Sequence, residues 1–151
     1  MFRNEIHTEA VIEGSADEVW AVLTDFGSYG EWNPGMDRVD GHAVVGTRLS
    51  ITFTRTGGRA MTMRPTVTVS EPGRELRWLG RLGAPGVFDG EHRFSIEASE
   101  PGWVTFIQEE RFRGLLVPFL RKMIEVDTVA TFHAVNEAIA RRVGELRSSH
   151  A

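Results

Sequence analysis

Three polar side chains share predicted strand faces with aromatic residues, and their chemistry suits ligand binding or proton transfer. His92 lies on the same side of its predicted strand as Phe94, while Gln108 and Glu110 lie on the same side of the next strand as Phe106. Burying such groups among aromatic rings is costly unless each finds a partner. An imidazole and a carboxyl group can also act as an acid–base pair. This face therefore predicts an interior that holds a ligand.

The two strands that carry these groups, 87–98 and Trp103–Arg113, are joined by a short turn and predict a β-hairpin. A register in which paired residue numbers sum to about 200 places His92 opposite Gln108 and Gly90 opposite Glu110. Trp78, on the preceding strand, then lies near Gly90 or His92. A slip of one residue would reverse the faces. The alternative interpretation is a polar network that satisfies itself and only sets the strand register.

The N-terminal half predicts a strand, two short helices and then further strands. Alternation in Glu5–Glu13 is typical of a strand. Ser15 and Glu18 have the spacing of a capping box and predict a helix that ends near Thr24, before a short helix or turn at 25–30. A loop follows at 32–35, and a hairpin turn is predicted at 56–59. Besides the two strands of the hairpin, the other predicted strands are 38–42, 47–55, 60–70 and Glu75–Leu82. Pro65, within 60–70, indicates an edge strand or a bulge there.

Residues 114–148 predict one long helix whose apolar stripe drifts along its length. Leu116 and Phe119 lead the stripe in the first half, whereas Phe132 and Ile139 lead it in the second. We therefore expect a bend, or different partners for the two halves. Asp127 falls inside the apolar sector of an ideal helix, where a carboxylate faces a pocket, pairs with an arginine or reaches water.

Together these elements predict a single α+β domain over residues 1–151. An antiparallel sheet of about seven strands curves around the C-terminal helix, and two short helices follow the first strand. Such a sheet encloses volume, so we expect an apolar pocket between it and the helix.

Composition excludes several classes of function. The chain has no cysteine, and its net charge is −4 with 17 basic residues scattered among 21 acidic ones, so neither a thiol site nor a nucleic-acid partner is expected. The five histidines lack ligand spacing and no nucleotide-binding motif occurs, so we expect no metal and no cofactor. No long apolar run occurs, which predicts a cytoplasmic protein without stable membrane insertion. A homodimer is left open.

Four segments carry a resemblance to a known superfamily: 16–26, Trp32-Asn33-Pro34, 88–94 and 108–112. They resemble the SRPBCC or START-like helix-grip proteins, and the last two resemble its bacterial polyketide cyclase/dehydrase branch. The resemblance implies a helix-grip fold with a deep cavity and a hydrophobic or amphipathic ligand. Some relatives are cyclases, dehydratases or hydrolases, and many only bind and carry. No catalytic set transfers residue by residue.

We therefore expect a non-enzymatic protein that binds a hydrophobic, lipid-, aromatic- or polyketide-like small molecule. The alternative is a cyclase or dehydratase in which His92 and Glu110 form the acid–base pair, without metal or nucleotide. A third hypothesis, a partner-binding module acting through the outer sheet face, is least favoured because arginines charge that face. The expected ligand-binding residues are Phe26, Trp32, Trp78, Phe88, His92, Phe106, Gln108, Glu110, Phe112, Phe119, Met123 and Asp127.

Overall fold

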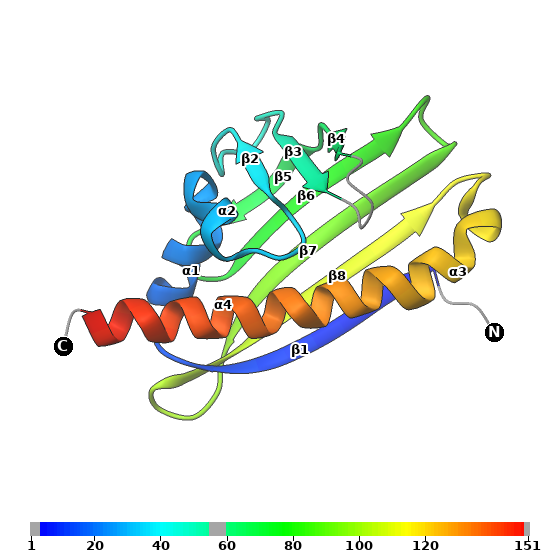
Figure 1. Cartoon of the computed structure of the whole chain (residues 1–151). Coiled ribbons are helices and arrows are strands. Elements are labelled where there is room, and N and C mark those ends of the chain that lie inside the picture. The colour runs from blue at the N-terminus through cyan, green and yellow to red at the C-terminus, as the bar shows by residue number, and fades with distance from the viewer. Residues whose placement is uncertain (1–3, 55–59, 150–151) are drawn as a thin grey trace.

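A long C-terminal helix lies along one face of an antiparallel sheet (Figure 1). The computed structural model of the chain describes residues 4–54 and 60–149, apart from the side chains of Thr54 and residues 123–125. The predicted turn at 56–59 lies outside these residues. Within them, one sheet has the order β1-β8-β7-β6-β5 and another the order β2-β3-β4. The strands are β1 (Glu5–Glu13), β2 (Arg38–Asp40), β3 (Ser50–Thr54), β4 (Ala60–Met63), β5 (Thr66–Glu71), β6 (Glu75–Leu82), β7 (Phe88–Ala98) and β8 (Trp103–Arg113).

The helices follow the predicted order. After β1 come α1 (Ala16–Thr24), the 3₁₀ turn η1 (Phe26–Ser28) and α2 (Tyr29–Trp32). After β8 come the 3₁₀ turn η2 (Val117–Leu120), α3 (Arg121–Met123), the π-helix η3 (Ile124–Thr128) and α4 (Val129–Ser149). This arrangement is the α+β architecture that the alternating strands and the terminal helix predict.

The β7–β8 hairpin confirms the predicted faces, but its register is two residues away from the predicted one. His92 pairs with Glu110 and Phe94 pairs with Gln108. A shift of two residues leaves every side chain on its expected face, because side chains alternate with a period of two. On the neighbouring strand β6, Trp78 pairs with His92, which is one of the two neighbours, Gly90 or His92, that the sequence predicts for it.

The segment 60–70 was expected to form one strand, and that expectation is wrong. The chain leaves β4 at Met63 and begins β5 at Thr66, so the two parts belong to different sheets. Pro65 lies at the break, where its missing N–H cannot serve a strand ladder. Among the described residues, one isolated bridge pairs Arg48, which precedes β3, with Thr66, the first residue of β5.

The helix α1 begins as its sequence predicts. The Ser15 hydroxyl accepts a hydrogen bond from the Glu18 N–H at 3.1 Å, and the Glu18 carboxylate accepts one from the Ser15 N–H at 2.9 Å. This reciprocal capping box satisfies N–H groups that a helix start otherwise leaves unpaired. It directs α1 so that Val19, Val22 and Leu23 are buried in the core.

The C-terminal segment is not one continuous α-helix, and its two halves have different partners, as the drifting stripe predicts. Leu120, from the predicted first half, packs against a smaller hydrophobic cluster, whereas Ile139 and Val143, from the second half, belong to the larger core. Phe132, which the stripe placed in the second half, belongs to the smaller cluster together with Phe88 and Phe112. A π-helical stretch precedes α4, and such stretches interrupt the regular ladder of an α-helix. In the described part of the chain, no helix combines the length and the apolar character needed to cross a bilayer.

Candidate functional site

A cluster of polar side chains lies between the sheet and α4, in the interior of the protein. We call it the inner polar cluster, and its members are Thr8, His92, Gln108, Glu110 and Asn136. Thr8, His92, Gln108 and Asn136 are each less than 5% exposed. Strands β1, β7 and β8 contribute all but Asn136, which comes from α4. Polar groups this deep need mutual hydrogen bonds.

A continuous hydrogen-bond chain crosses the cluster from the sheet to α4. The Gln108 amide donates to Asn136 Oδ1 at 2.7 Å and to the Phe132 carbonyl at 3.2 Å, so its oxygen faces His92. His92 Nε2 lies 3.0 Å from that oxygen and is therefore the protonated ring nitrogen. The Asn136 amide donates in turn to the Thr8 hydroxyl at 3.0 Å. This network holds the imidazole in one tautomer and one orientation.

The His92 ring is enclosed by aromatic side chains. Its centroid lies 4.1 Å from that of Phe94 and 4.8 Å from that of Phe132, both in stacked geometry, and 5.5 Å from that of Trp78. We expected the imidazole to open into a hollow between the sheet and the helix. The structure corrects this expectation, because Phe132 of α4 packs onto the ring.

Glu110 is the member of the cluster that reaches accessible space. Its Oε2 lies 3.6 Å from His92 Nδ1, and its side chain is 18% exposed, against 5% for His92. Gly90 makes room for the carboxyl group, since a Cβ atom there would lie 2.8 Å from Glu110 Oε1. A glycine at this position of the strand therefore permits the carboxyl group to lie over the sheet.

Burial shifts the two titratable groups of the cluster in opposite directions. It lowers the pKa of His92 to about 4, an effect that the hydrogen bond to Gln108 only partly offsets. It raises the pKa of Glu110 to about 7. At neutral pH the imidazole is uncharged and presents an unprotonated Nδ1 toward Glu110. The carboxyl group exchanges its proton near pH 7, as a general acid or base requires.

Most of the expected apolar residues are buried, and they fall into two groups. Phe26, Trp78 and Phe106 belong to the larger core, and Phe88 and Phe112 belong to the smaller cluster under η2 and α4. The aromatic rings of Phe88 and Phe112 lie 5.6 Å apart, and Phe112 is also close to the space beside Gly90 that holds the Glu110 carboxyl group. An apolar surface and an ionisable carboxyl group therefore meet at this end of the sheet.

Two of the expected site residues lie outside the interior. Phe119 is 82% exposed because it lies on the 3₁₀ turn η2, before the long helix begins. Asp127 is exposed as well, since the π-helix η3 does not follow the 3.6-residue period that placed it in the apolar sector. The side chain of Met123 lies outside the described part of the chain.

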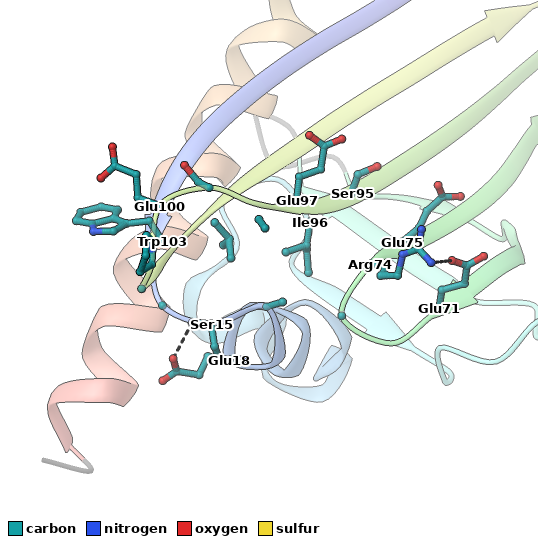
Figure 2. A pocket seen from close by; sticks show the side chains of 18 of the residues that line it. Ser15, Glu18, Glu71, Arg74, Glu75, Ser95, Ile96, Glu97, Glu100 and Trp103 are labelled. Carbon is teal, nitrogen blue, oxygen red and sulfur yellow. Dashed lines mark hydrogen bonds and ion pairs between the residues drawn. The ribbon is translucent and has the colours of Figure 1, made fainter.

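Two hollows are distinct from the inner polar cluster. One, of about 250 Å³, lies between α1 and α4 and includes Trp32 in its lining. The other, of about 940 Å³, lies at the end of the molecule near the β7–β8 turn and the start of α1 (Figure 2). Several of its charged side chains pair with one another, as Arg93 does with Glu75 and Arg74 with Glu71. Such a lining does not suit a hydrophobic ligand.

Sequence reasoning did not find Thr8 and Asn136 as members of the site. Thr8 alternates with Ile6 and Ala10 on the buried face of β1, and Asn136 has the helical spacing of Phe132 and Ile139. A polar residue inside an apolar stripe is the signal that identifies both. Among the described residues, no three histidine, aspartate or glutamate side chains converge as ligands of a metal ion would.

The comparisons with known proteins agree with this architecture. The family model for "polyketide cyclase / dehydrase and lipid transport" matches residues 3–145. No curated protein sequence matches the chain significantly. A solved protein from Chromobacterium violaceum has a TM-score of 0.74 and 18% identity, with 93% of this chain and 96% of that chain covered.

Two further solved structures show the same fold. A START superfamily protein from Mycobacterium smegmatis has a TM-score of 0.71 and 18% identity, over 94% of this chain and 98% of that chain. The Zhui aromatase/cyclase from a Streptomyces strain has a TM-score of 0.76 and 16% identity, over 93% of both chains. Identities this low show a shared fold, and they carry no statement about substrate.

Proposed function

The chain belongs to the polyketide cyclase/dehydrase and lipid transport family, and from that premise we propose that it binds a hydrophobic or amphipathic small molecule between its sheet and its C-terminal helical segment. Cyclisation, dehydration and lipid transport all require a protein to hold an apolar small molecule. The ligand class that we propose is lipid-, aromatic- or polyketide-like.

The observation that carries this proposal is the position of Glu110. A carboxyl group beside aromatic rings is costly in a dry core, and its pKa is raised accordingly to about 7. Its partly exposed side chain remains reachable, whereas His92 behind it is enclosed. We infer that Glu110 contacts a hydroxyl or carbonyl group of the ligand, while Phe88 and Phe112 contact its apolar part.

The route to this site leads through the segment formed by η2, α3 and η3. Leu120, the last residue of η2, and Val129, the first residue of α4, are partly buried and pack against the smaller hydrophobic cluster. The segment changes from a 3₁₀ turn through one short α-helix to a π-helix. Its pattern of backbone hydrogen bonds is therefore less regular than that of α4. We infer that it moves to admit the ligand.

A matched pair of fluorescent tricyclic probes tests the proposal. Anthracenemethanol carries a hydroxyl group where methylanthracene carries only a hydrogen, and both fit the proposed ligand class. We expect saturable binding of both to the native protein. Glu110→Gln should weaken anthracenemethanol binding about tenfold, because a hydrogen bond to an ionisable group contributes roughly that factor to affinity. The same substitution should leave methylanthracene binding unchanged.

Glu109→Gln is the matched control, since Glu109 lies on the same strand but pairs with Arg93 and His7 instead. It should bind both probes like the native protein. Absence of saturable binding of either probe would overturn the proposed function. If Glu110→Gln reduced the affinity for both probes equally, the contact assigned to Glu110 would be overturned.

A second candidate function, proton-transfer catalysis on a polyketide-like substrate, is favoured by the distance of 3.6 Å between Glu110 and His92 Nδ1. In a cyclised β-hydroxy ketone, the Glu110 carboxylate would take a proton from the carbon next to the carbonyl group. A C=C bond forms as the C–O bond breaks, and the protonated carboxyl group returns the proton to the hydroxyl group, which leaves as water. His92→Phe and Glu110→Gln should then abolish product formation, followed by mass spectrometry, without loss of substrate binding. Product formation at native rates in both variants would exclude this pair as catalysts.

A further inference from the structure

Apolar side chains project into solvent at the end of the molecule where β8 leads into the C-terminal segment. Leu115 is 78% exposed, Leu116 is 42% exposed and Phe119 is 82% exposed. Isolated exposed apolar residues are ordinary, but a group within one short turn marks an interaction surface. Figure 1 shows this turn beside the label α3, at the end opposite α1 and α2.

The fold holds these side chains outward. The Leu115 N–H donates to the Gly86 carbonyl and the Leu116 N–H to the Val87 carbonyl, each at 3.0 Å. Val117 follows as a buried anchor, 2% exposed, in the smaller hydrophobic cluster. The turn is therefore fixed to the adjacent β6–β7 connection, and its apolar side chains are presented by a supported backbone.

The charge of this segment is opposite to that of the rest of the chain. Residues 111–124 include four basic residues and no acidic one. The rest of the chain includes the other 13 basic residues and all 21 acidic residues. Arg111 is paired with Glu5 at 2.7 Å. Arg113, Arg121 and Lys122 are exposed around the apolar turn, and Lys122 is the only lysine of the chain. Glu125 follows this segment in the sequence, and Asp127, on η3, is the first acid after it whose exposure the structure describes.

We propose that this docking tip, formed by Leu115, Leu116 and Phe119 with Arg113, Arg121 and Lys122, binds the surface of an anionic lipid bilayer. The apolar side chains enter the interfacial region while the cations contact anionic headgroups, as in peripheral membrane proteins. This use of the tip goes beyond small-molecule binding and does not depend on it.

Two observations favour a lipid surface over a protein partner. Leu115 and Phe119 protrude almost completely, and neither lines the two hollows described above, so both side chains offer points of insertion into a bilayer. The remainder of the chain has more acidic than basic residues, so an anionic surface favours approach by this segment.

Vesicle flotation tests the proposal with the full chain. Phosphatidylcholine vesicles with and without about 30% phosphatidylserine are mixed with protein at low salt, and the floated fraction is measured. We expect native protein to float with anionic vesicles, at least about tenfold more than with neutral ones, and to be released at about 0.5 M salt. Leu115→Ser with Phe119→Ser, and separately Arg113→Gln with Lys122→Gln, should each reduce flotation about tenfold.

The double variant Val44→Ser with Val45→Ser is the control, because both valines are 60% exposed but lie on the connection between β2 and β3. It should float like the native protein. Native protein that stays in solution with anionic vesicles would overturn the proposal. So would unchanged flotation of the Leu115 and Phe119 variant, or sedimentation showing that Phe119 instead holds two copies together. Circular dichroism of each variant verifies that a loss of flotation is not a loss of fold.

Discussion

At the residue scale, the main feature is a buried imidazole and a mostly buried carboxyl group whose titrations offset each other. The pKa of His92 falls from 6.5 to about 4, so its contribution to stability is complete above pH 6.5 and is lost as the pH falls toward 4. The pKa of Glu110 rises from 4.5 to about 7, so its contribution is complete below pH 4.5 and is lost as the pH rises toward 7. Between pH 4.5 and 6.5 the folded pair holds one proton, on Glu110, and the unfolded pair also holds one, on His92.

The variant Glu110→Gln should make stability depend on pH where the native protein is insensitive. Only the His92 contribution then remains, so lowering the pH from 6.5 to 4.5 should reduce the free energy of unfolding by about 2 to 3 kcal/mol relative to the native protein. Urea denaturation at both pH values measures this difference. The outward-facing Glu109→Gln should follow the native profile. A Glu110→Gln profile parallel to that of the native protein would refute the offsetting pair.

At the element scale, local hydrogen bonds decide where helices begin. Ser15 caps α1 through its hydroxyl group, whereas Ser28 precedes α2 and its side chain makes no capping hydrogen bond. These two serines lie within one short stretch of chain and differ in this respect. The contrast separates the effect of a cap from the effect of losing a hydroxyl group.

The substitution Ser15→Ala should lower the free energy of unfolding by about 1 kcal/mol, because the Glu18 N–H loses its partner. Ser28→Ala should change it by less than about 0.5 kcal/mol, as is usual for a surface change without a lost contact. Thermal or urea denaturation of both variants measures the difference. Equal effects of the two substitutions would show that the capping box contributes little to stability.

At the scale of the whole molecule, the C-terminal segment covers two hydrophobic clusters of unequal size. The second half of α4 seals the larger one with Ile139 and Val143, while η2 and the start of α4 cover the smaller one. Elements that cover little apolar surface open at lower free energy than elements in a main core. The two ends of the protein should therefore differ in local stability.

Amide hydrogen exchange should reveal this difference directly. Amides of residues 117–128 should exchange at least about tenfold faster than those of residues 132–143, because the first segment is 3₁₀- and π-helical over the smaller cluster. Saturation with anthracenemethanol should slow exchange in 117–128. Uniform protection along the whole segment would contradict the proposed access route.

Prediction from sequence succeeded where the information is local or periodic. Alternation assigned the faces of β7 and β8, and the spacing of Ser15 and Glu18 assigned the start of α1. The pairing register of the hairpin was two residues off, yet His92 still contacts Gln108, because a shift of two keeps both residues on one face. The fold class followed from this local information, and the family was predicted from the resemblance that four segments carry.

The amino-acid sequence by itself determined the order of the elements, the strand faces and the presence of a histidine, a glutamine and a carboxyl group on the inner face. Only the tertiary structure decided that Asn136 and Thr8, 128 residues apart in the chain, complete the hydrogen-bond network, and that Phe119 and Asp127 face outward. The reason is physical: side-chain alternation and capping act between neighbouring residues. Contacts across the interior depend instead on how α4 packs against the sheet, and on the 3₁₀ and π turns that set its rotation.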